Sequence, residues 1–290
     1  MRRLCCGLLL VAAGVGCSVN EIGKIPCRDT SHCPSDYPTC SAAGYCVNST
    51  PTTTIEVVSG DAQTAVVGNA LAQSLVVRVL DTNGNAVPNF GVTWSVGSGA
   101  GQVSAGSTNT GPDGKASITA TVGTTAGGNT FTASAAGLTG RNFTATGIPD
   151  VANTLVLSGP DSSTAGAIQP FTVTAQDKFA NVAVSYRGTV SFTSSDGAAT
   201  LPSAYAFSAN DAGAHQFSLT LKTAGTRSVT AGDGSLSITK PGITVNPASA
   251  VTLVVTGFAN TVTAGTAGTV TVTARDTFGN TATGYLGTVQ

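Results

Sequence analysis

The chain has 290 residues, of which 41% are hydrophobic and only 9% are charged, and its formal net charge at pH 7 is −1. This length is enough for two or three domains of ordinary size, while the charged fraction lies far below the roughly 25% usual for soluble domains. The composition excludes a long coiled coil. Because nucleic-acid binding needs clustered Lys or Arg, and only Arg2 and Arg3 are adjacent, no nucleic-acid partner is expected.

The N-terminus has the composition of an export signal. Met1–Arg3 supply positive charge, and Leu8–Ala13 form an apolar run that is too short to span a bilayer. The following Gly14-Val15-Gly16-Cys17 resembles the bacterial lipoprotein cleavage box, although Gly14 departs from the Leu usual at its position. We predict a signal peptide over residues 1–16 and a lipid on Cys17. The alternative is ordinary signal cleavage nearby, which leaves Cys17 as a free thiol.

Four further cysteines lie close together in the next segment, at Cys27, Cys33, Cys40 and Cys46. An even number of cysteines in an exported segment with few apolar residues predicts two disulfides, with three pairings open. The competing interpretation is a zinc site with His32 as an additional ligand, but the gaps between these cysteines differ from the paired spacing of structural zinc sites. The sequence therefore predicts a small disulfide-rich module and linker over residues 17–50.

One short segment then recurs three times, with copies roughly 100 residues apart, which is close to the length of one immunoglobulin-like (Ig-like) β-sandwich. The strand before each copy alternates apolar and polar residues, which predicts a half-buried antiparallel strand. The inward residues are Leu75, Val77 and Val79 in the first copy, Phe171, Val173 and Ala175 in the second, and Val270, Val272 and Ala274 in the third. Similar alternation recurs about every ten residues without a convincing helix. The predicted class is all-β, with tandem Ig-like β-sandwiches after the disulfide-rich module.

Each copy ends with an Asp and an Asn four residues apart, and these six residues are Asp81, Asn85, Asp177, Asn181, Asp276 and Asn280. The carboxylate can accept backbone N–H groups within a tight turn, and Asn and Gly tolerate left-handed backbone angles. We therefore predict that these residues are structural turn residues. The first copy also matches half of a calcium-binding loop. Because the other copies carry Phe at the middle position and no Glu follows at the proper distance, we predict no metal and no cofactor.

The repeats define the expected domain boundaries. We predict Ig-like domain 1 at residues 51–147, domain 2 at 148–247 and an incomplete domain 3 at 248–290. The junctions are short and contain Pro149 and Pro247, which limits bending and predicts a semi-rigid rod. The third copy begins so late that only its first strands are present. We expect it to be a frayed fragment of a longer protein.

Three runs in the first repeat, Val79–Asn89, Val92–Trp94 and Thr110–Ala116, carry a family resemblance. With them, residues 55–147 resemble a bacterial Ig-like group 1 domain, the kind strung along invasin- and intimin-type adhesins. The second and third copies resemble a related Ig-like repeat that occurs in tandem in large bacterial surface proteins. This second resemblance rests on Thr164–Gly166, Tyr186–Phe192, Ser195–Gly197, Ala214–Phe217, Leu221–Gly225, Thr263–Gly265 and Tyr285–Val289. Such resemblances imply the fold and transfer no catalytic or binding residue.

Catalytic constellations are absent from the sequence pattern. The chain has only His32 and His215, no Gly-x-Ser-x-Gly segment, and acidic residues that stand singly in turn contexts, among them Asp196 and Asp211. We predict that the chain is not an enzyme and has no catalytic residue.

Large aromatic residues are candidate ligand contacts. Trp94 and Phe192 fall at matching inward positions, so a core role is predicted over sugar stacking. Phe179 and Phe278 recur inside the Asp–Asn turn. They are expected to cover a sandwich end or to pack against the neighbouring domain, and the alternative is a ligand contact.

The predicted function is that of a cell-surface structural or adhesion protein, in which Ig-like repeats form a stalk that projects or presents a binding surface. The alternative is a carbohydrate- or matrix-binding module that accompanies a larger exported enzyme. The expected location is the outer membrane or cell surface, with a lipid anchor, or alternatively the medium after secretion. The expected partners are the membrane and a host-cell, matrix or polysaccharide ligand. The sequence leaves the oligomeric state open.

Overall fold

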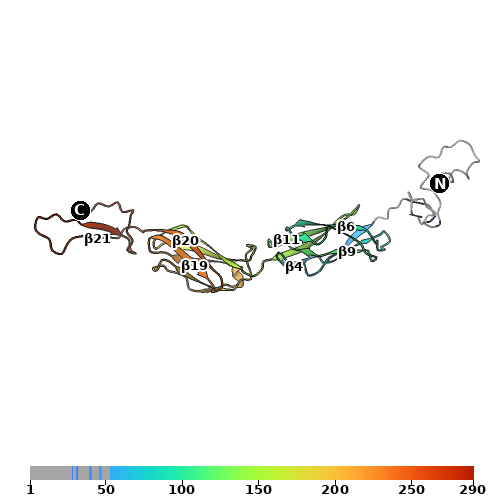
Figure 1. Ribbon diagram of the computed structural model, residues 1–290, viewed down its shortest axis with the longest axis horizontal. Coiled ribbons are helices and arrows are strands. Elements are labelled where there is room, and N and C mark those ends of the chain that lie inside the picture. The colour runs from blue at the N-terminus through green and yellow to red at the C-terminus, as the bar shows by residue number, and fades with distance from the viewer. Residues whose placement is uncertain (1–27, 29–30, 32–38, 41–45, 48–52) are drawn as a thin grey trace, which may run out of the picture.

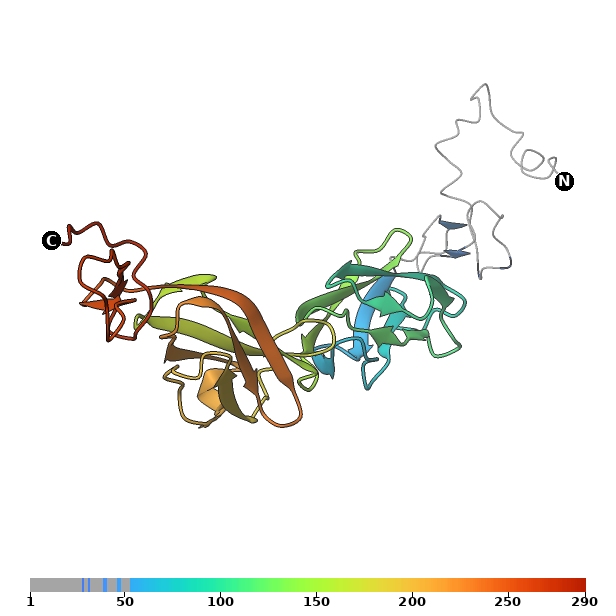
Figure 2. The ribbon, with the colours of Figure 1, turned by 60° about the vertical axis from the view of Figure 1, so that its left-hand side comes forward.

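The computed structural model describes residues 28, 31, 39–40, 46–47 and 53–290, and these form an elongated row of β-structure (Figures 1 and 2). Two β-sandwiches stand end to end, followed by a smaller two-stranded unit. The all-β class predicted from the alternating pattern is confirmed. Within the described residues, no helix has the length and hydrophobicity needed to cross a membrane.

The first sandwich consists of two main sheets. The three-stranded sheet has the order β3 (Thr54–Ser59), β5 (Leu75–Leu80), β9 (Lys115–Ile118). The five-stranded sheet has the order β4 (Gln63–Val66), β12 (Arg141–Ile148), β11 (Gly127–Ala135), β6 (Gly91–Ser98), β8 (Ser107–Asn109). A short pair, β7 (Gln102–Val103) and β10 (Ala120–Thr121), lies outside these sheets. Within the two main sheets, neighbouring strands are antiparallel except β4 and β12, which are parallel.

The second sandwich repeats this arrangement. Its three-stranded sheet has the order β13 (Thr154–Ser158), β15 (Ile168–Gln176), β18 (Ala214–Thr220). Its five-stranded sheet has the order β14 (Ser162–Thr164), β20 (Ser237–Asn246), β19 (Gly225–Gly232), β16 (Thr189–Ser194), β17 (Tyr205–Ala206). The strands β14 and β20 are again parallel, and a three-residue 3-10 helix, η3 (Ala209–Asp211), precedes β18.

Each sandwich has its own core, built from the alternating residues of the facing sheets. In β5 the inward residues Leu75, Val77 and Val79 are fully buried, and the intervening residues are only partly buried. Trp94 and Phe192 are buried in the two cores, and the Trp94 indole N–H donates to Thr108 Oγ1 at 2.8 Å. The core role predicted for both aromatic residues is confirmed, which removes Trp94 as a platform for a sugar.

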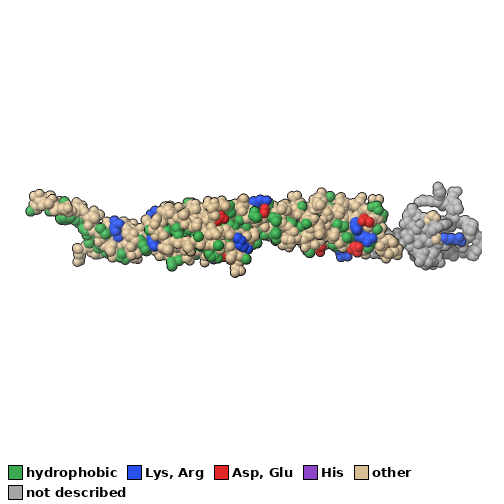
Figure 3. Space-filling model, turned by 90° about the horizontal axis from the view of Figure 1, so that it is seen from below, with side chains coloured by type: hydrophobic (Ala, Val, Ile, Leu, Met, Phe, Trp, Pro, Cys, Tyr) green, Lys and Arg blue, Asp and Glu red, His purple; other side chains and the backbone are tan. Residues whose placement is uncertain are grey.

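The third unit is a single antiparallel pair, β21 (Thr252–Thr256) and β22 (Thr271–Arg275). Its strands match β13 and β15 of the second sandwich in sequence and in pairing. Along the face seen in Figure 3, charged side chains are sparse and scattered, as expected from the composition.

In the N-terminal segment the structure describes two short antiparallel strands, in which β1 (Thr39–Cys40) pairs with β2 (Cys46–Val47). The backbones of Cys40 and Cys46 stand opposite each other in this pair. The other cysteines of the predicted disulfides, Cys27 and Cys33, and the predicted lipid site Cys17 lie outside the described residues. The disulfide and lipid assignments therefore stay predictions.

Candidate functional site: the joints between sandwiches

The Asp–Asn turn of the second sandwich is fixed by the Asp177 carboxylate. Asp177 Oδ1 accepts the backbone N–H groups of Phe179 (2.8 Å) and Asn181 (2.9 Å), and Asp177 Oδ2 accepts the Asn181 side-chain N–H at 2.9 Å. Asp177 is 1% exposed, so these donors replace the water that it would otherwise bind. Ala180 adopts a left-handed φ of 67° inside the turn, a conformation in which a non-glycine residue is strained by roughly 1–2 kcal/mol.

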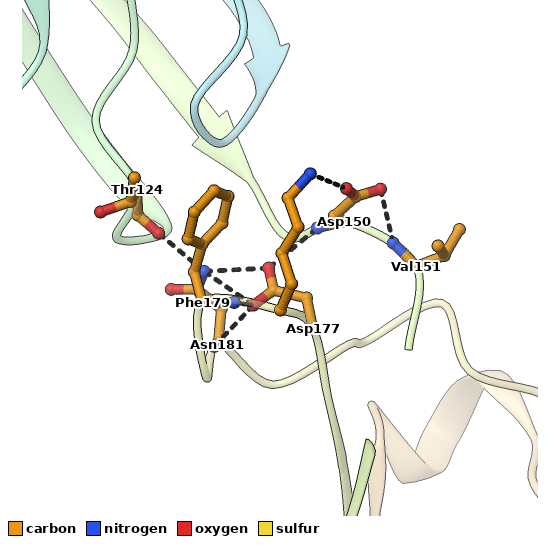
Figure 4. A network of polar contacts seen from close by, with 7 residues as sticks. Thr124, Asp150, Val151, Asp177, Phe179 and Asn181 are labelled. Carbon is orange, nitrogen blue, oxygen red and sulfur yellow. Dashed lines mark hydrogen bonds and ion pairs between the residues drawn. The ribbon is translucent and has the colours of Figure 1, made fainter. Parts of the chain in front are cut away.

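The same Asn181 side chain also reaches the preceding sandwich (Figure 4). Its Nδ2 donates to the backbone oxygen of Thr124 at 2.8 Å, and its Oδ1 accepts the backbone N–H of Ala126 at 2.8 Å. Thr124 and Ala126 belong to the loop between β10 and β11 of the first sandwich. One amide group thus fixes its own turn and binds a neighbouring domain. We call the contact between these two sandwiches the first joint.

Phe179 supplies the apolar part of the first joint. A Cβ built on Gly68 would stand 3.2 Å from Phe179 Cζ, so the ring lies over the backbone of the first sandwich. Gly68 also has a φ of +76°, so two separate reasons favour glycine there. Phe179 is 39% exposed, which agrees with packing against a neighbour at a surface rather than burial in a core. Of the two roles expected for this residue in the fold, the structure shows contact with the adjacent domain.

The connecting segment is tied into the same network. The backbone N–H of Asp150 donates to Asp177 Oδ2 at 3.1 Å, and Lys178 Nζ lies 3.2 Å from Asp150 Oδ2. Lys178 is more than half exposed, so solvent and salt screen this ion pair and it adds little stability. The backbone hydrogen bond is the stronger constraint because it fixes the chain where it enters the second sandwich.

The second joint repeats the first with different residues. Asn280 Nδ2 donates to the backbone oxygen of Lys222 at 2.8 Å, and Asn280 Oδ1 accepts the backbone N–H of Ala224 at 2.8 Å. The ring of Phe278 lies directly over Gly166, where an added Cβ would collide with it.

The hydrogen bond from the linker backbone to the Asp carboxylate is also present in both joints. The backbone N–H of Ala248 donates to Asp276 Oδ2 at 2.9 Å, as that of Asp150 does to Asp177. The second joint has Ala248 in the place of Asp150 and Thr277 in the place of Lys178, so neither partner of the ion pair is present there. The ion pair is therefore particular to the first joint, and the Asn, Phe and Gly contacts are common to both.

The turn of the first sandwich has the same internal bonds, and among the described residues it makes none of these outer contacts. Asp81 Oδ1 accepts the backbone N–H groups of Asn83 and Asn85, both at 2.8 Å, and Asp81 Oδ2 accepts the Asn85 side-chain N–H at 3.1 Å. Asn83 stands where the later copies carry Phe, and Asn85 is exposed. Three N–H donors aim at this carboxylate, which favours the turn interpretation over a calcium site. Among the described residues, no group of three His, Cys, Asp or Glu side chains is arranged to hold a metal ion.

The joint carboxylates are held in their charged form. Burial by itself raises the pKa of Asp177, but hydrogen bonds from the Asn181 side chain and from the backbone of Asp150, Asn181 and Phe179 outweigh it and lower this pKa below its usual value. The pKa of Asp276 is lowered by the same balance of burial and hydrogen bonds. At neutral pH both groups therefore act as acceptors only.

Two buried polar residues, Asn129 and Asp196, support the loops that Asn181 and Asn280 bind. In the first sandwich, Asn129 Oδ1 accepts the backbone N–H of Gly123 at 2.9 Å. In the second, Asp196 accepts the backbone N–H groups of Lys222 (2.6 Å) and Thr223 (2.9 Å). The sequence around Asp196 indicates only a local turn, whereas these partners lie 26 and 27 residues further along the chain. No local pattern signals such a contact.

A second polar cluster lies on the second sandwich, away from both joints. His215 Nδ1 is 2.6 Å from Asp211 Oδ1, and the Tyr205 ring stacks on His215 with centroids 4.0 Å apart. The backbone N–H of Ser208 also donates to Asp211 Oδ2 at 2.6 Å, and this bond is the leading cause of a strongly lowered pKa for Asp211. The sequence places Asp211 in a turn without a second carboxylate, and η3 brings it beside His215. Its oxygens are used by the cap of this short helix and by its neighbours.

Comparison with known proteins identifies the first sandwich. Residues 51–148 match the family model of the bacterial Ig-like domain (group 1). This segment belongs to that family. The group 1 domain covers the first sandwich, and the resemblance stated from its sequence is confirmed. No curated protein sequence matches the chain.

Solved structures similar to this chain include those of bacterial adhesins. The adhesin FdeC of Escherichia coli shares 22% identity over 81% of this chain and 76% of that chain, with a TM-score of 0.45. Invasin, described as a bacterial integrin-binding protein, shares 19% identity over 80% of this chain and 48% of its own, with a TM-score of 0.37. The adhesin InvE of Yersinia pseudotuberculosis shares 17% identity over 67% of this chain and 59% of that chain, with a TM-score of 0.30.

Proposed function

We propose that this chain is the stalk of an adhesin-type protein at a bacterial cell surface, in which Ig-like units at residues 51–147, 148–247 and 248–290 are locked end to end. The observation that carries the proposal is the repeated joint. An Asn side chain bridges to the loop of the preceding sandwich through the same two hydrogen bonds in both joints. A repeated contact of this kind serves the relative placement of domains rather than chemistry on a substrate.

The geometry of the joint explains why such a stalk resists bending. A linker alone is one attachment point, about which a domain can swing. The Asn181 bonds to the Thr124–Ala126 loop and the contact of Phe179 with Gly68 add two more points. Each hydrogen bond contributes only about 1 kcal/mol, but the linker keeps the two surfaces at a high effective concentration, so weak contacts suffice.

Attachment to the cell completes the proposed function. The apolar run before Cys17 and the small residues beside it support export and lipidation, which would place the stalk on a membrane, with its units projecting outward. Labelling with a palmitate analogue tests this part. The wild-type chain should incorporate the label and the Cys17→Ser chain should not, whereas equal labelling of both proteins would remove the lipid anchor.

Small-angle scattering tests the stalk itself. In the Phe179→Ala chain the ring contact with Gly68 is lost, so the distribution of interdomain distances should broaden and the longest dimension should vary more. The matched control is Asn83→Ala, which changes the same turn position in the first sandwich. It should leave the scattering unchanged. If Phe179→Ala scatters like the wild type, the ring does not stiffen the joint.

A further inference from the structure

Apolar residues of the third unit are exposed at positions that the second sandwich buries. Leu155 in β13 is 1% exposed, whereas its counterpart Leu253 in β21 is 44% exposed. Val173 in β15 is fully buried, whereas its counterpart Val272 in β22 is 37% exposed. The residues are of the same chemical kind and sit on strands paired in the same way. The difference therefore lies in what covers the strands.

In the second sandwich the cover comes from one continuous stretch, residues 189–246. It contains β18, which pairs with the free edge of β15 and sets Phe217 opposite Phe171. It also contains β16, β19 and β20, whose buried residues complete the core. In the third unit β22 pairs only with β21 among the described residues, so the edge that β18 occupies on β15 is open on β22.

The tyrosines of the two units show the same difference. Tyr186 is 8% exposed, donates to Asp233 Oδ2 at 2.6 Å and packs edge-on against Phe207 with ring centroids 5.0 Å apart. Its counterpart Tyr285 is 39% exposed and borders a hollow of about 360 Å³ beside the linker residues 247–250. Both partners of Tyr186 belong to the 189–246 stretch.

At the other end of the third unit, the turn after β22 makes the same contacts as the turn of the second sandwich. Asp276 is only 3% exposed and accepts the full set of bonds seen at the first joint, including that from the linker at Ala248. The second joint thus holds β22 and the turn after it in place. Among the described residues, the edge of β22 is unpaired and the apolar face of β21 and β22 is uncovered, whereas the second joint holds these strands in place.

We propose that this edge and face form a docking surface for a polypeptide segment with the strand pattern of residues 189–246. Such a segment corresponds to the second half of an Ig-like repeat of the type that forms the second sandwich. A strand like β18 would add antiparallel to β22. Main-chain hydrogen bonds along the edge give affinity in such an addition, and alternate side chains entering the apolar face give selectivity. The partner therefore carries apolar residues at every second position, as Phe217 and Leu219 do in β18.

A second copy of the third unit does not meet this requirement. It offers the same first-half positions, and none of its strands corresponds to β16, β18, β19 or β20. The two complete sandwiches of a second copy have already used their own second halves.

The test extends the full chain after Gln290 with a copy of its residues 192–246, because Val289 and Gln290 occupy the places of Val190 and Ser191. Amide hydrogen exchange is then compared in β21 and β22. These amides should exchange at least about 100-fold more slowly in the extended chain than in the original. The control extension carries Phe217→Asp and Leu219→Asp within the appended copy, and it should leave the exchange fast.

Three results would overturn the proposal. The first is strong protection of β21 and β22 in the original chain while light scattering shows a monomer, since the face then needs no cover. The second is protection that appears with dimer formation as concentration rises, which makes a second copy the occupant. The third is equal exchange in the original chain and in the chain with the unaltered extension.

Discussion

The turn at Asp81–Asn85 and the turn at Asp177–Asn181 have the same internal hydrogen bonds and different surroundings. In both, one carboxylate oxygen accepts two backbone N–H groups and the other accepts the Asn side chain. In the second turn the Asn also binds the preceding sandwich, and Phe179 lies over Gly68. Residues 82–85 of the first turn are exposed, whereas the second turn contacts the preceding sandwich.

The difference separates two roles within one motif. The Asp and the internal bonds fix the turn whether or not a neighbour is present. The remaining donor and acceptor capacity of the Asn, together with the aromatic ring, makes the joint. This division predicts that Asp variants disturb the turn and, with it, the joint, whereas Asn and Phe variants chiefly change how sandwiches are placed relative to each other.

The largest effect is expected for Asp177→Ala. It leaves the backbone N–H groups of Phe179, Asn181 and Asp150 without their acceptor in a buried place, at a cost of about 2–3 kcal/mol. Asp81→Ala is the matched control, and it should cost less because water reaches the freed groups of the open turn. Amide exchange in each sandwich measures both losses. Equal losses of stability in the two sandwiches would show that contact with a neighbouring sandwich does not change the cost of removing the Asp.

A smaller effect is expected from adding one methyl group at the glycine under the ring. Gly166 and Gly265 have nearly the same φ, +85° and +86°, but a Cβ at Gly166 meets the Phe278 ring and one at Gly265 meets nothing within 4 Å. Both alanine variants should lose about 1–2 kcal/mol through backbone strain. Only Gly166→Ala should also displace the ring and loosen the second joint. Scattering curves that change equally in both variants would contradict the proposed ring contact.

Acid should weaken both joints over a defined range. Because the pKa values of Asp177 and Asp276 are lower in the folded chain, their contribution is complete above the unfolded value of about 3.9 and is lost as pH falls below it, through the folded pKa. Scattering at decreasing pH should therefore report a stiff rod at neutral pH and a more flexible one only as pH falls through the lowered pKa of the folded chain. The Asp177→Asn chain, which lacks one of these titrating groups, should change less. A rod that becomes stiffer on acidification would contradict this assignment.

Strand positions and core residues followed from the sequence because they depend on local alternation. Leu75, Val77 and Val79 needed only a period of two, and the recurring Asp and Asn indicated a shared turn. The joints did not follow in the same way. Asn181 contacts residues 55 and 57 positions away, and the turn already gave it a sufficient local explanation. Nothing in the pattern indicated that its amide had a second use.

One signal for the joints was present in the sequence. Gly166 and Gly265 recur in the same Thr-Ala-Gly segment, and Phe179 and Phe278 recur in the turn. A glycine and an aromatic residue that recur once per repeat are compatible with contact between successive repeats. The choice between a cover over the same sandwich and contact with the next one required the spatial arrangement.

The central claim is that the Asn side chain couples adjacent sandwiches, and residual dipolar couplings of the full chain test it most directly. In the wild-type protein the first and second sandwiches should report one common alignment tensor. In Asn181→Ala, which loses both bonds to the Thr124–Ala126 loop, the two tensors should differ in magnitude. Asn85→Ala, the change at the open turn, should keep them equal. Equal tensors for the two sandwiches in Asn181→Ala would contradict the account.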